Sequence, residues 1–288
     1  MPKKYRVQRH VLIFSISICK PNHSLLHFFE SHRYVHFLKE LKNILRCARQ
    51  PAPLSYLHQM KTIGLIGGIT WLSTLDYYRL LNQKINQQLG GVNSAKLIIS
   101  SVNFDEIKTL TLADDWDGLT VIMRKEAKRL EEAGADCILI GANTMHNIAD
   151  EVQASINIPL IHVAEETGKE ITRLQLKKVA LLGTKYTMQL PFYKNKLAAQ
   201  GIETIIPNEK DIEYINSAIY TEMGKGIFLP ERKEEFINII NKLKAEGAEG
   251  VILGCTEIPI LIKQEDSPIP VFDTTAIHAT AAVNFALS

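Results

Sequence analysis

Short apolar runs alternate with longer amphipathic segments from residue 61 onward. The apolar runs predict strands at residues 62–67, 96–102, 137–140 and 159–163, and again from 178, near 205–207 and at 251–253. Helical spacing of apolar residues predicts helices at 72–89, 119–133, 209–223 and 231–246. Because these strands are too apolar to have a solvated face, the pattern predicts an α/β fold of mostly parallel sheets with helices on both faces. Ligands in such folds bind beyond the carboxyl ends of the strands.

This pattern occurs twice along the chain. The stretches AGADCILIGANT (133–144) and EGAEGVILGCTE (246–257) share glycines, an acidic residue and an apolar strand at matching positions. The stretches KTIGLIGG (61–68) and KKVALLGT (177–184) form a second matching pair. Such a repeat predicts two related α/β lobes, at residues 60–165 and 166–288. A C-terminal helix near 273–287 could pack back onto the first lobe.

The repeat aligns Ala142, at a strand end in the first lobe, with Cys255 in the second. A pseudo-twofold axis between the lobes would bring these two strand ends face to face across one cleft. A ligand there would present opposite faces to Ala142 and Cys255. The predicted active site therefore lies between the lobes.

The balance of basic and acidic residues changes at Met60. Residues 1–59 contain ten Lys and Arg against two acidic residues, whereas residues 60–288 contain 23 against 29. We interpret residues 1–59 as a basic extension that function does not require. An anchor or export signal is the alternative, because basic residues precede an apolar run at 11–19.

Composition narrows the range of functions. The four cysteines form no C-x-x-C pair, and no apolar run approaches the roughly 18 residues that span a bilayer, so reduced thiols, a cytoplasmic location and no membrane partner are expected. Nucleic acid is not an expected partner, because the chain after residue 59 is acidic. The turn GLIGGIT matches neither the dinucleotide nor the P-loop pattern, which argues against a nucleotide enzyme.

Cys255 is the candidate catalytic residue. It follows a strand, and Glu257-Ile258-Pro259 resembles the start of a helix, whose amide groups would lower the pKa of the thiol. A buried, inert cysteine is the alternative interpretation. If Cys255 acts alone, the opposite face of the ligand would be served by water or by a neighbour such as His146, whereas His278 is expected to pack.

Neutral donors follow the same strand ends and are candidates for substrate binding. Asn143, Thr144 and Thr256 come directly after the paired positions, and Thr184 ends the strand that matches the one ending at Gly68. Gly68 is a further candidate contact with the substrate, at the equivalent strand end of the first lobe. Such groups can hold the carboxylate of a substrate while charge develops at its Cα. The alternative is that they only form turns or cap helices.

Residues 60–288 resemble the aspartate/glutamate racemase family, especially its amino-acid racemases that act on aspartate and glutamate without pyridoxal phosphate. The stretches IGLIGGITWLSTLDYYRLLN, ANTMH, LLGTKYTM, GCTEI and FDTTAIHA carry the resemblance. It implies two flavodoxin-like lobes, no cofactor, no metal, a small amino-acid substrate and often a homodimer. It also implies that residue 142 and Cys255 are the two acid/base groups, and that Asn143, Thr144 and Thr256 bind the α-carboxylate.

The sequence departs from the family at two places. Ala142 stands where the family usually has Cys, and a methyl group cannot exchange a proton. The Arg that many aspartate racemases carry after the second strand is missing, since Lys108 is the only basic residue between Lys96 and Arg124. Lys225 lies near the position of a substrate-contacting Lys in such enzymes.

Three functions follow from these observations. The first is cofactor-independent racemisation of aspartate or glutamate, with Cys255 as the surviving acid/base. The second is a one-thiol decarboxylase or isomerase of a small carboxylic acid, because some relatives work with one thiol in the second lobe. The third is a catalytically impaired homologue that binds amino acids.

Overall fold

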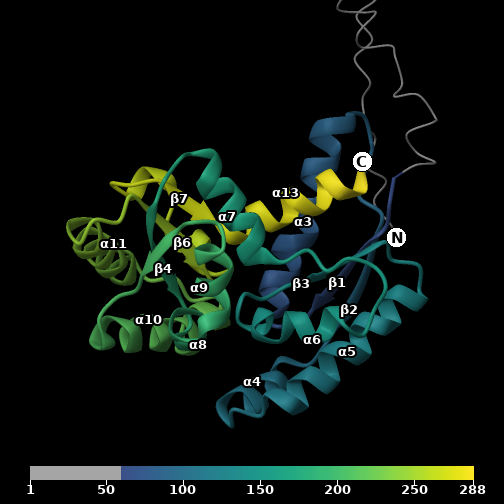
Figure 1. Ribbon diagram of the computed structural model, residues 1–288, viewed down its shortest axis with the longest axis horizontal. Helices are drawn as coiled ribbons and strands as arrows, with labels where there is room; N and C mark the ends of the chain where they lie inside the picture. The colour runs from purple at the N-terminus through teal and green to yellow at the C-terminus, as the bar shows by residue number, and fades with distance from the viewer. Residues whose placement is uncertain (1–59) are drawn as a thin grey trace, which may run out of the picture. The chain divides into compact units, whose positions relative to one another are not determined.

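Two parallel sheets, each flanked by helices, form two lobes in the computed structural model (Figure 1). The structure describes residues 60–288, so the extension predicted at residues 1–59 lies outside the described residues. The three-stranded sheet of the first lobe has the order β2-β1-β3, and the four-stranded sheet of the second has the order β5-β4-β6-β7. All pairings within both sheets are parallel, as the apolar strands predicted.

The first lobe contains the elements from β1 to α6. Its strands are β1 Ile63–Gly67, β2 Leu97–Ser101 and β3 Cys137–Ile140. Its helices are α3 Trp71–Leu89, α4 Phe104–Leu112, α5 Trp116–Glu132, the 3-10 helix η2 Thr144–Ile148 and α6 Ala149–Gln153. Helix α7 Val163–Arg173 follows, and its buried Val163, Ala164 and Ile171 pack in the core of the second lobe.

The second lobe begins at β4 and includes the end of the chain. Its strands are β4 Lys178–Gly183, β5 Glu203–Ile205, β6 Gly250–Gly254 and β7 Val271–Asp273. Its helices are α8 Lys185–Gln189, α9 Pro191–Ala198, α10 Glu209–Thr221, η3 Met223–Lys225, α11 Pro230–Ala245, α12 Ile258–Leu261, η4 Gln264–Asp266 and α13 Thr274–Ala286.

The internal repeat has a direct structural counterpart. In each sheet the first strand of the lobe is central, the second lies on one side and the third on the other. The acidic residues of the repeat make equivalent hydrogen bonds. Asp136 Oδ2 accepts one from the backbone N–H of Thr62 at 2.6 Å, and Glu249 Oε2 accepts one from the backbone N–H of Lys178 at 3.1 Å. Each carboxylate thus ties the start of one strand to the start of its neighbour.

Two segments differ from the sequence-based predictions. The strand predicted at 159–163 is reduced to a single parallel bridge between Leu160 and Ile138. The reason is local: His162 caps α7 by accepting the N–H of Ala164, so helix begins where the strand was expected to end. Helix α4 was not predicted, and it forms part of the cavity wall described below.

The last helix of the chain packs against the first lobe. Buried residues of α13, Ala279, Ala282 and Val283, share a core cluster with Tyr77 and Leu81 of α3. Figure 1 shows α13 in yellow beside α3 and α7.

Candidate active site

A cavity of about 240 Å³ is lined by residues from both lobes. In the first lobe these residues follow β1 and β3 or belong to α4, and in the second they follow β4 and β6 or lie near η3. Carboxyl ends of parallel strands are the usual ligand-binding edge of an α/β sheet. Two such edges therefore contribute to one site.

Ala142 and Cys255 both line this cavity, as the repeat predicted. Both residues are 9% exposed, and each comes directly after a glycine that packs against the neighbouring strand. An added Cβ would lie 3.1 Å from the carbonyl oxygen of Ile66 at Gly141 and 2.9 Å from that of Leu182 at Gly254. The missing side chains allow both turns to lie close to the central strands.

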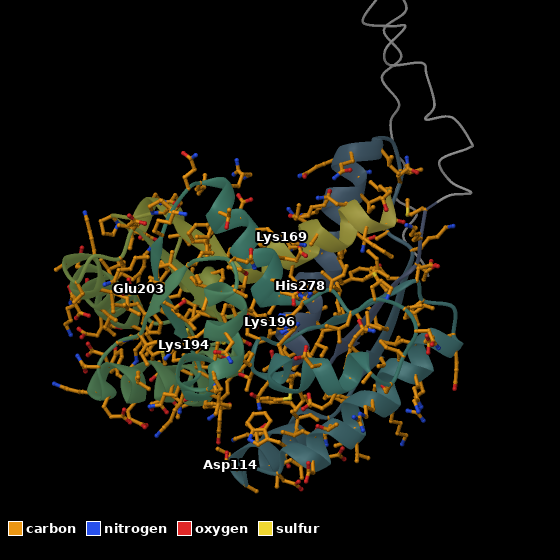
Figure 2. The ribbon with its side chains drawn as sticks, in the orientation of Figure 1. Asp114, Lys169, Lys194, Lys196, Glu203 and His278 are labelled. Carbon is orange, nitrogen blue, oxygen red and sulfur yellow. The ribbon has the colours of Figure 1, made fainter. Side chains whose placement is uncertain are left out.

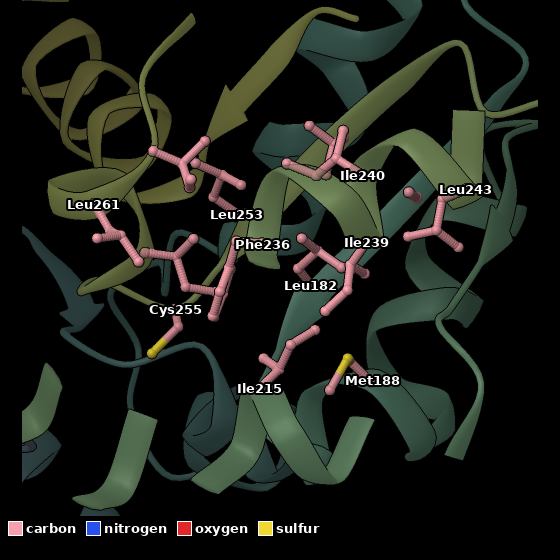
Figure 3. Packing of buried hydrophobic residues seen from close by; sticks show 14 of the residues in the cluster. Leu182, Met188, Ile215, Phe236, Ile239, Ile240, Leu243, Leu253, Cys255 and Leu261 are labelled. Carbon is pink, nitrogen blue, oxygen red and sulfur yellow. The ribbon is translucent and has the colours of Figure 1, made fainter. Parts of the chain in front are cut away.

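The thiol of Cys255 donates a hydrogen bond to Glu257 Oε2, with 3.0 Å between sulfur and oxygen. The hydroxyl of Thr256 donates to the same oxygen at 2.7 Å, and the hydroxyl of Thr70, from the first lobe, donates to Oε1 at 2.9 Å. Glu257 is buried, with 4% of its surface exposed. Figure 3 shows the Cys255 sulfur at the border of the apolar cluster of the second lobe.

The structure corrects the prediction that a helix start lowers the pKa of Cys255. Burial raises the pKa of this thiol well above its usual value, and the charge and hydrogen bond of Glu257 raise it further. The backbone N–H groups of Glu257 and Thr256 act in the opposite direction but do not prevail. Helix α12, which follows, has only four residues, so its dipole is small.

The predicted substrate-binding residues Asn143, Thr144, Thr184 and Thr256 all line the cavity. The hydroxyls of Thr144 and Thr184 lie 2.9 Å apart and join the two lobes by a hydrogen bond. Asn143 Nδ2 donates to Thr274 Oγ1 at 3.0 Å, and Thr274 donates onward to the carbonyl of Leu253. These groups are therefore held in place before any ligand binds.

Gly68 differs from the other predicted contacts because it is not part of the cavity wall. It adopts φ +84°, and an added Cβ would lie 2.1 Å from the carbonyl oxygen of Val102. Its N–H donates to Thr74 Oγ1 at 2.7 Å. The structure thus places Gly68 in the turn that leads to Ile69 and Thr70, which do line the cavity.

The Asp/Glu/Hydantoin racemase family model matches residues 66–282 of this chain. The chain belongs to this family. Membership makes the protein an isomerase of the amino-acid racemase type. The match covers both lobes and includes Ala142, Glu257 and Cys255.

Individual relatives agree with this family. The chain is 29% identical over 173 residues to the broad specificity amino-acid racemase RacX of Bacillus subtilis (strain 168), an alignment covering 59% of this chain and 73% of the relative. A candidate Asp/Glu racemase from Yersinia pestis is 44% identical and aligns with a TM-score of 0.75 over 80% of this chain and all of that one. An aspartate racemase homologue from Pyrococcus horikoshii OT3 is 38% identical, with a TM-score of 0.71 over the same shares.

The charged residues of the racemase cavity are Asp105, Lys108, Lys225 and Glu257, and no arginine lines it within residues 60–288. Neither lysine has an ion-pair partner in that part of the chain. Two unpaired ammonium groups give this cavity the means to attract an anionic ligand.

Sequence reasoning missed the roles of Glu257 and Thr70. Glu257 was visible in the motif GCTE but was interpreted as the beginning of a helix. Its position two residues after a candidate thiol was the signal that could have identified it. No sequence signal pointed to Thr70, because its partner lies 187 positions away in the other lobe.

His146 and His278 lie behind the cavity wall rather than on it. Because a carbonyl oxygen accepts, His146 Nδ1 donates to Ala142 O, at 2.9 Å. His278 lies between Tyr77 OH, 2.8 Å from Nδ1, and the carbonyl of Ile161, 2.7 Å from Nε2. The expected packing role of His278 agrees with these contacts, whereas His146 is not placed to touch a ligand.

Residues 60–288 contain neither a cluster suited to a metal ion nor a helix suited to a membrane. No group of three or more His, Cys, Asp and Glu side chains in this range has an arrangement that could hold a metal ion. None of the helices described there has both the length and the apolar character needed to cross a membrane.

Proposed function

We propose that this protein racemises aspartate or glutamate without a cofactor, with Cys255 as its acid/base group. The observation that carries the proposal is that Cys255 and Ala142, at equivalent strand ends, line one cavity. Proton removal and return on opposite faces of Cα require groups on two sides of the ligand. In this chain one side has a thiol and the other a methyl group.

The ring of neutral donors supports an amino-acid substrate. Asn143, Thr144, Thr184 and Thr256 surround the cavity, and charge that develops at Cα spreads onto the α-carboxylate, which such donors stabilise. Their hydrogen bonds across the lobes fix them in advance, which lowers the reorganisation needed during the reaction.

The lysines support an acidic side chain on the substrate. An amino acid with a second carboxylate carries net charge −1 at pH 7, and Lys108 and Lys225 are cations on the cavity wall without ion-pair partners among the described residues. The role that many aspartate racemases give to an arginine would fall to these two ammonium groups. Each is a flexible point charge, so discrimination among acidic side chains should be weaker than with a bidentate guanidinium.

The reaction begins when the Cys255 sulfur, as thiolate, removes the Cα proton from one enantiomer. Ala142 cannot return a proton to the opposite face, so water serves that face. Because a positioned acid/base group is worth about 10²–10⁴-fold in rate, return from the Cys255 side should exceed return from the Ala142 side by a factor in this range.

Exchange of the Cα proton with solvent deuterium tests this function. We expect one enantiomer of aspartate or glutamate to exchange its Cα proton much faster than it inverts, and Cys255→Ser to abolish the exchange. A Cys137→Ser variant is the matched control, because Cys137 is a buried thiol inside β3 and away from the cavity. Exchange that survives Cys255→Ser would contradict the assignment of the base.

The single thiol also favours a second candidate, decarboxylation of a small malonate-type acid. Release of CO₂ from such an acid, together with no Cα exchange from any amino acid, would replace the racemase proposal with this one. Binding of amino acids without either reaction would indicate an impaired homologue. A cytoplasmic location and a homodimer stay predictions.

A further inference from the structure

Helix α4 forms one wall of the cavity but has few anchors of its own. Five of its residues line the cavity: Phe104, Asp105, Ile107, Lys108 and Thr111. Of the nine residues in this helix, only Ile107 and Thr111 are buried. A segment with few buried contacts has low local stability. The position of this wall therefore depends on the contacts made at the ends of the helix.

Tyr186 ties the carboxyl end of α4 to the second lobe. Its hydroxyl donates a hydrogen bond to the carbonyl oxygen of Thr111 at 2.9 Å. Carbonyl groups in the last turn of a helix have no partner within the helix, so this oxygen can accept from outside it. Within residues 60–288 this is the one hydrogen bond between α4 and the second lobe. The Tyr186 ring also meets the ring of Trp116, the first residue of α5, edge to face, with 5.7 Å between centroids.

A well-anchored part of the second lobe presents Tyr186. This residue belongs to α8, which begins directly after β4 and is capped by the side chain of Thr184. The backbone N–H of Lys185 donates to Asn216 Oδ1 at 2.9 Å, which ties α8 to α10. Met188 of the same helix is fully buried in the core of the second lobe. A donor fixed in the second lobe thus reaches the weakly anchored wall of the first.

The polar floor of the cavity is almost closed to solvent. None of its strand-end residues is more than 9% exposed: Ala142, Asn143, Thr144, Thr184, Cys255 and Thr256. Because water touches little of these side chains, an amino acid reaches them only when a wall moves outward. Enzymes commonly admit and retain their ligands by such movements of loops or lobes.

The two chain crossings between the lobes lie away from the Tyr186 contact. One crossing leads from α6 to α7, which packs in the second lobe, and the other leads from β7 to α13, which packs on the first. They touch each other, because His278 Nε2 lies 2.7 Å from the carbonyl oxygen of Ile161. Figure 1 shows α7 and α13 at the upper end of the boundary between the lobes and α4 and α8 at its lower end. If the lobes rotate about the crossings, the contact between Tyr186 and Thr111 separates.

We propose that Tyr186 is a positioning residue that clamps α4 against the second lobe and so closes the cavity over its ligand. The clamp consists of the Tyr186 hydroxyl, the Thr111 carbonyl and the Trp116 ring. Its role in turnover rests on the proposed function, since a fixed α4 holds Lys108 beside an acidic substrate. The clamp itself requires no particular substrate.

Alkylation of Cys255 by iodoacetamide measures how often the cavity opens. The full-length protein is treated without ligand at pH 8.5, and the Cys255 peptide is followed by mass spectrometry. Tyr186→Phe keeps the ring beside Trp116 and removes the hydrogen bond to Thr111. Loss of one such bond should shift the equilibrium toward the open form, so we expect alkylation to be about fivefold faster than in the wild type. Alkylation at the wild-type rate or slower overturns the proposal.

Tyr193→Phe is the matched control. The Tyr193 hydroxyl donates to Thr167 Oγ1 at 3.2 Å, and both residues are buried within the second lobe. The variant therefore loses the same chemical group without any change at α4, and its Cys255 should react at the wild-type rate. Equal acceleration in both variants overturns the proposal, because a general loss of stability would then explain the result.

Cys137 provides an internal reference in the same samples. It is a buried thiol inside β3 and does not line the cavity, so iodoacetamide reaches it only when the first lobe unfolds. We expect its alkylation to be equally slow in the wild type and in Tyr186→Phe. Acceleration at Cys137 equal to that at Cys255 contradicts a local opening of the cavity.

Steady-state kinetics give a second readout that a purely structural role would not move in the same way. The clamp holds the bound substrate and the transition state equally, so its loss removes uniform binding. Tyr186→Phe should therefore raise KM for the acidic amino acid by about fivefold and leave kcat close to the wild-type value. A lower kcat with an unchanged KM contradicts the proposal.

The alkylation experiment separates the clamp from the racemase function, because it needs no substrate. Faster alkylation of Tyr186→Phe, together with no Cα exchange from any amino acid, would leave the clamp established and overturn the racemase function. Cα exchange in the wild type, together with unchanged alkylation of Tyr186→Phe, would leave the racemase function and overturn the clamp.

Discussion

Ala142 and Cys255 are exposed to the same extent, 9% each, and their side chains differ by one sulfur atom. The backbone around them is equivalent, because each follows a glycine at the end of a strand next to the central strand of its sheet. The difference between them is therefore chemical rather than structural. It leaves one face of the cavity with an acid/base group and the other without.

Ala142→Cys should restore a group on the second face. We expect inversion of aspartate or glutamate to accelerate by roughly 10²-fold, and the rate of Cα exchange to approach the rate of inversion. Chiral chromatography measures inversion and proton NMR in deuterated water measures exchange. Ala149→Cys is the control, because residue 149 is buried but does not line the cavity. An unchanged ratio of exchange to inversion would show that residue 142 does not face the substrate.

The turn between β1 and α3 presents Thr70 to Glu257, and its shape depends on Gly68. The chain at Gly68 needs φ +84°, and the space beside it is filled by the backbone of Val102. Thr70 then caps α3 by accepting the N–H of Ser73 at 3.2 Å. One turn therefore closes a strand, starts a helix and positions a donor of the site.

Gly68→Ala should destabilise the protein more than Gly90→Ala. Both glycines have positive φ, which costs about 1–2 kcal/mol for Ala, but an added Cβ meets nothing within 4 Å at Gly90. At Gly68 it overlaps backbone, which should add roughly 1–3 kcal/mol. Urea unfolding of the two variants measures the difference, and equal losses would contradict the crowding seen at Gly68.

At the scale of elements, sequence patterns located most strands and long helices. Helices α3, α5, α10 and α11 were predicted within a few residues of their bounds, because each has an apolar stripe at helical spacing. Helix α4 was missed, although its Asn103 cap and acidic first turn are present in the sequence. The strand predicted at 159–163 shortens to one parallel bridge at Leu160, since capping by His162 starts α7 at Val163.

Three histidines from distant segments meet between the lobes. His146 lies in η2 and His162 precedes α7. His278 belongs to α13 and is labelled in Figure 2. The centroid of the His146 ring lies 4.8 Å from the centroid of the His162 ring and 5.5 Å from that of the His278 ring. Burial is the main cause that lowers the pKa of all three rings. The pKa falls to about 4 for His146, about 2 for His162 and about 3 for His278.

Stability of the whole molecule should therefore fall as the pH drops below the unfolded histidine value of about 6.5. The folded pKa values are depressed, so the unfolded chain binds more protons, and the stability present above pH 6.5 is lost on acidification. Between pH 7.5 and 5.5 each histidine should cost about 1 kcal/mol. Nearby charges act in both directions, since Glu165 raises the pKa of His146 and Lys196 lowers that of His162.

Urea unfolding at the two pH values measures this loss. His278→Gln should lower the difference between pH 7.5 and pH 5.5 by about 1 kcal/mol, whatever it does to stability at pH 7.5. A pH-independent free energy of unfolding in the wild type would show that the three rings are not held neutral.

The sequence alone determined the duplicated α/β plan and the two strand ends that share the site. These features are local or repetitive: apolar periodicity specifies strands and helices, and a repeat specifies that two lobes have equivalent edges. Tertiary structure alone decided that Thr70 reaches Glu257, that Glu257 accepts a hydrogen bond from Cys255, and that burial raises rather than lowers the pKa of the thiol. Hydrogen bonds between the lobes and desolvation depend on side chains far apart in the chain, so no pattern in the sequence encodes them directly.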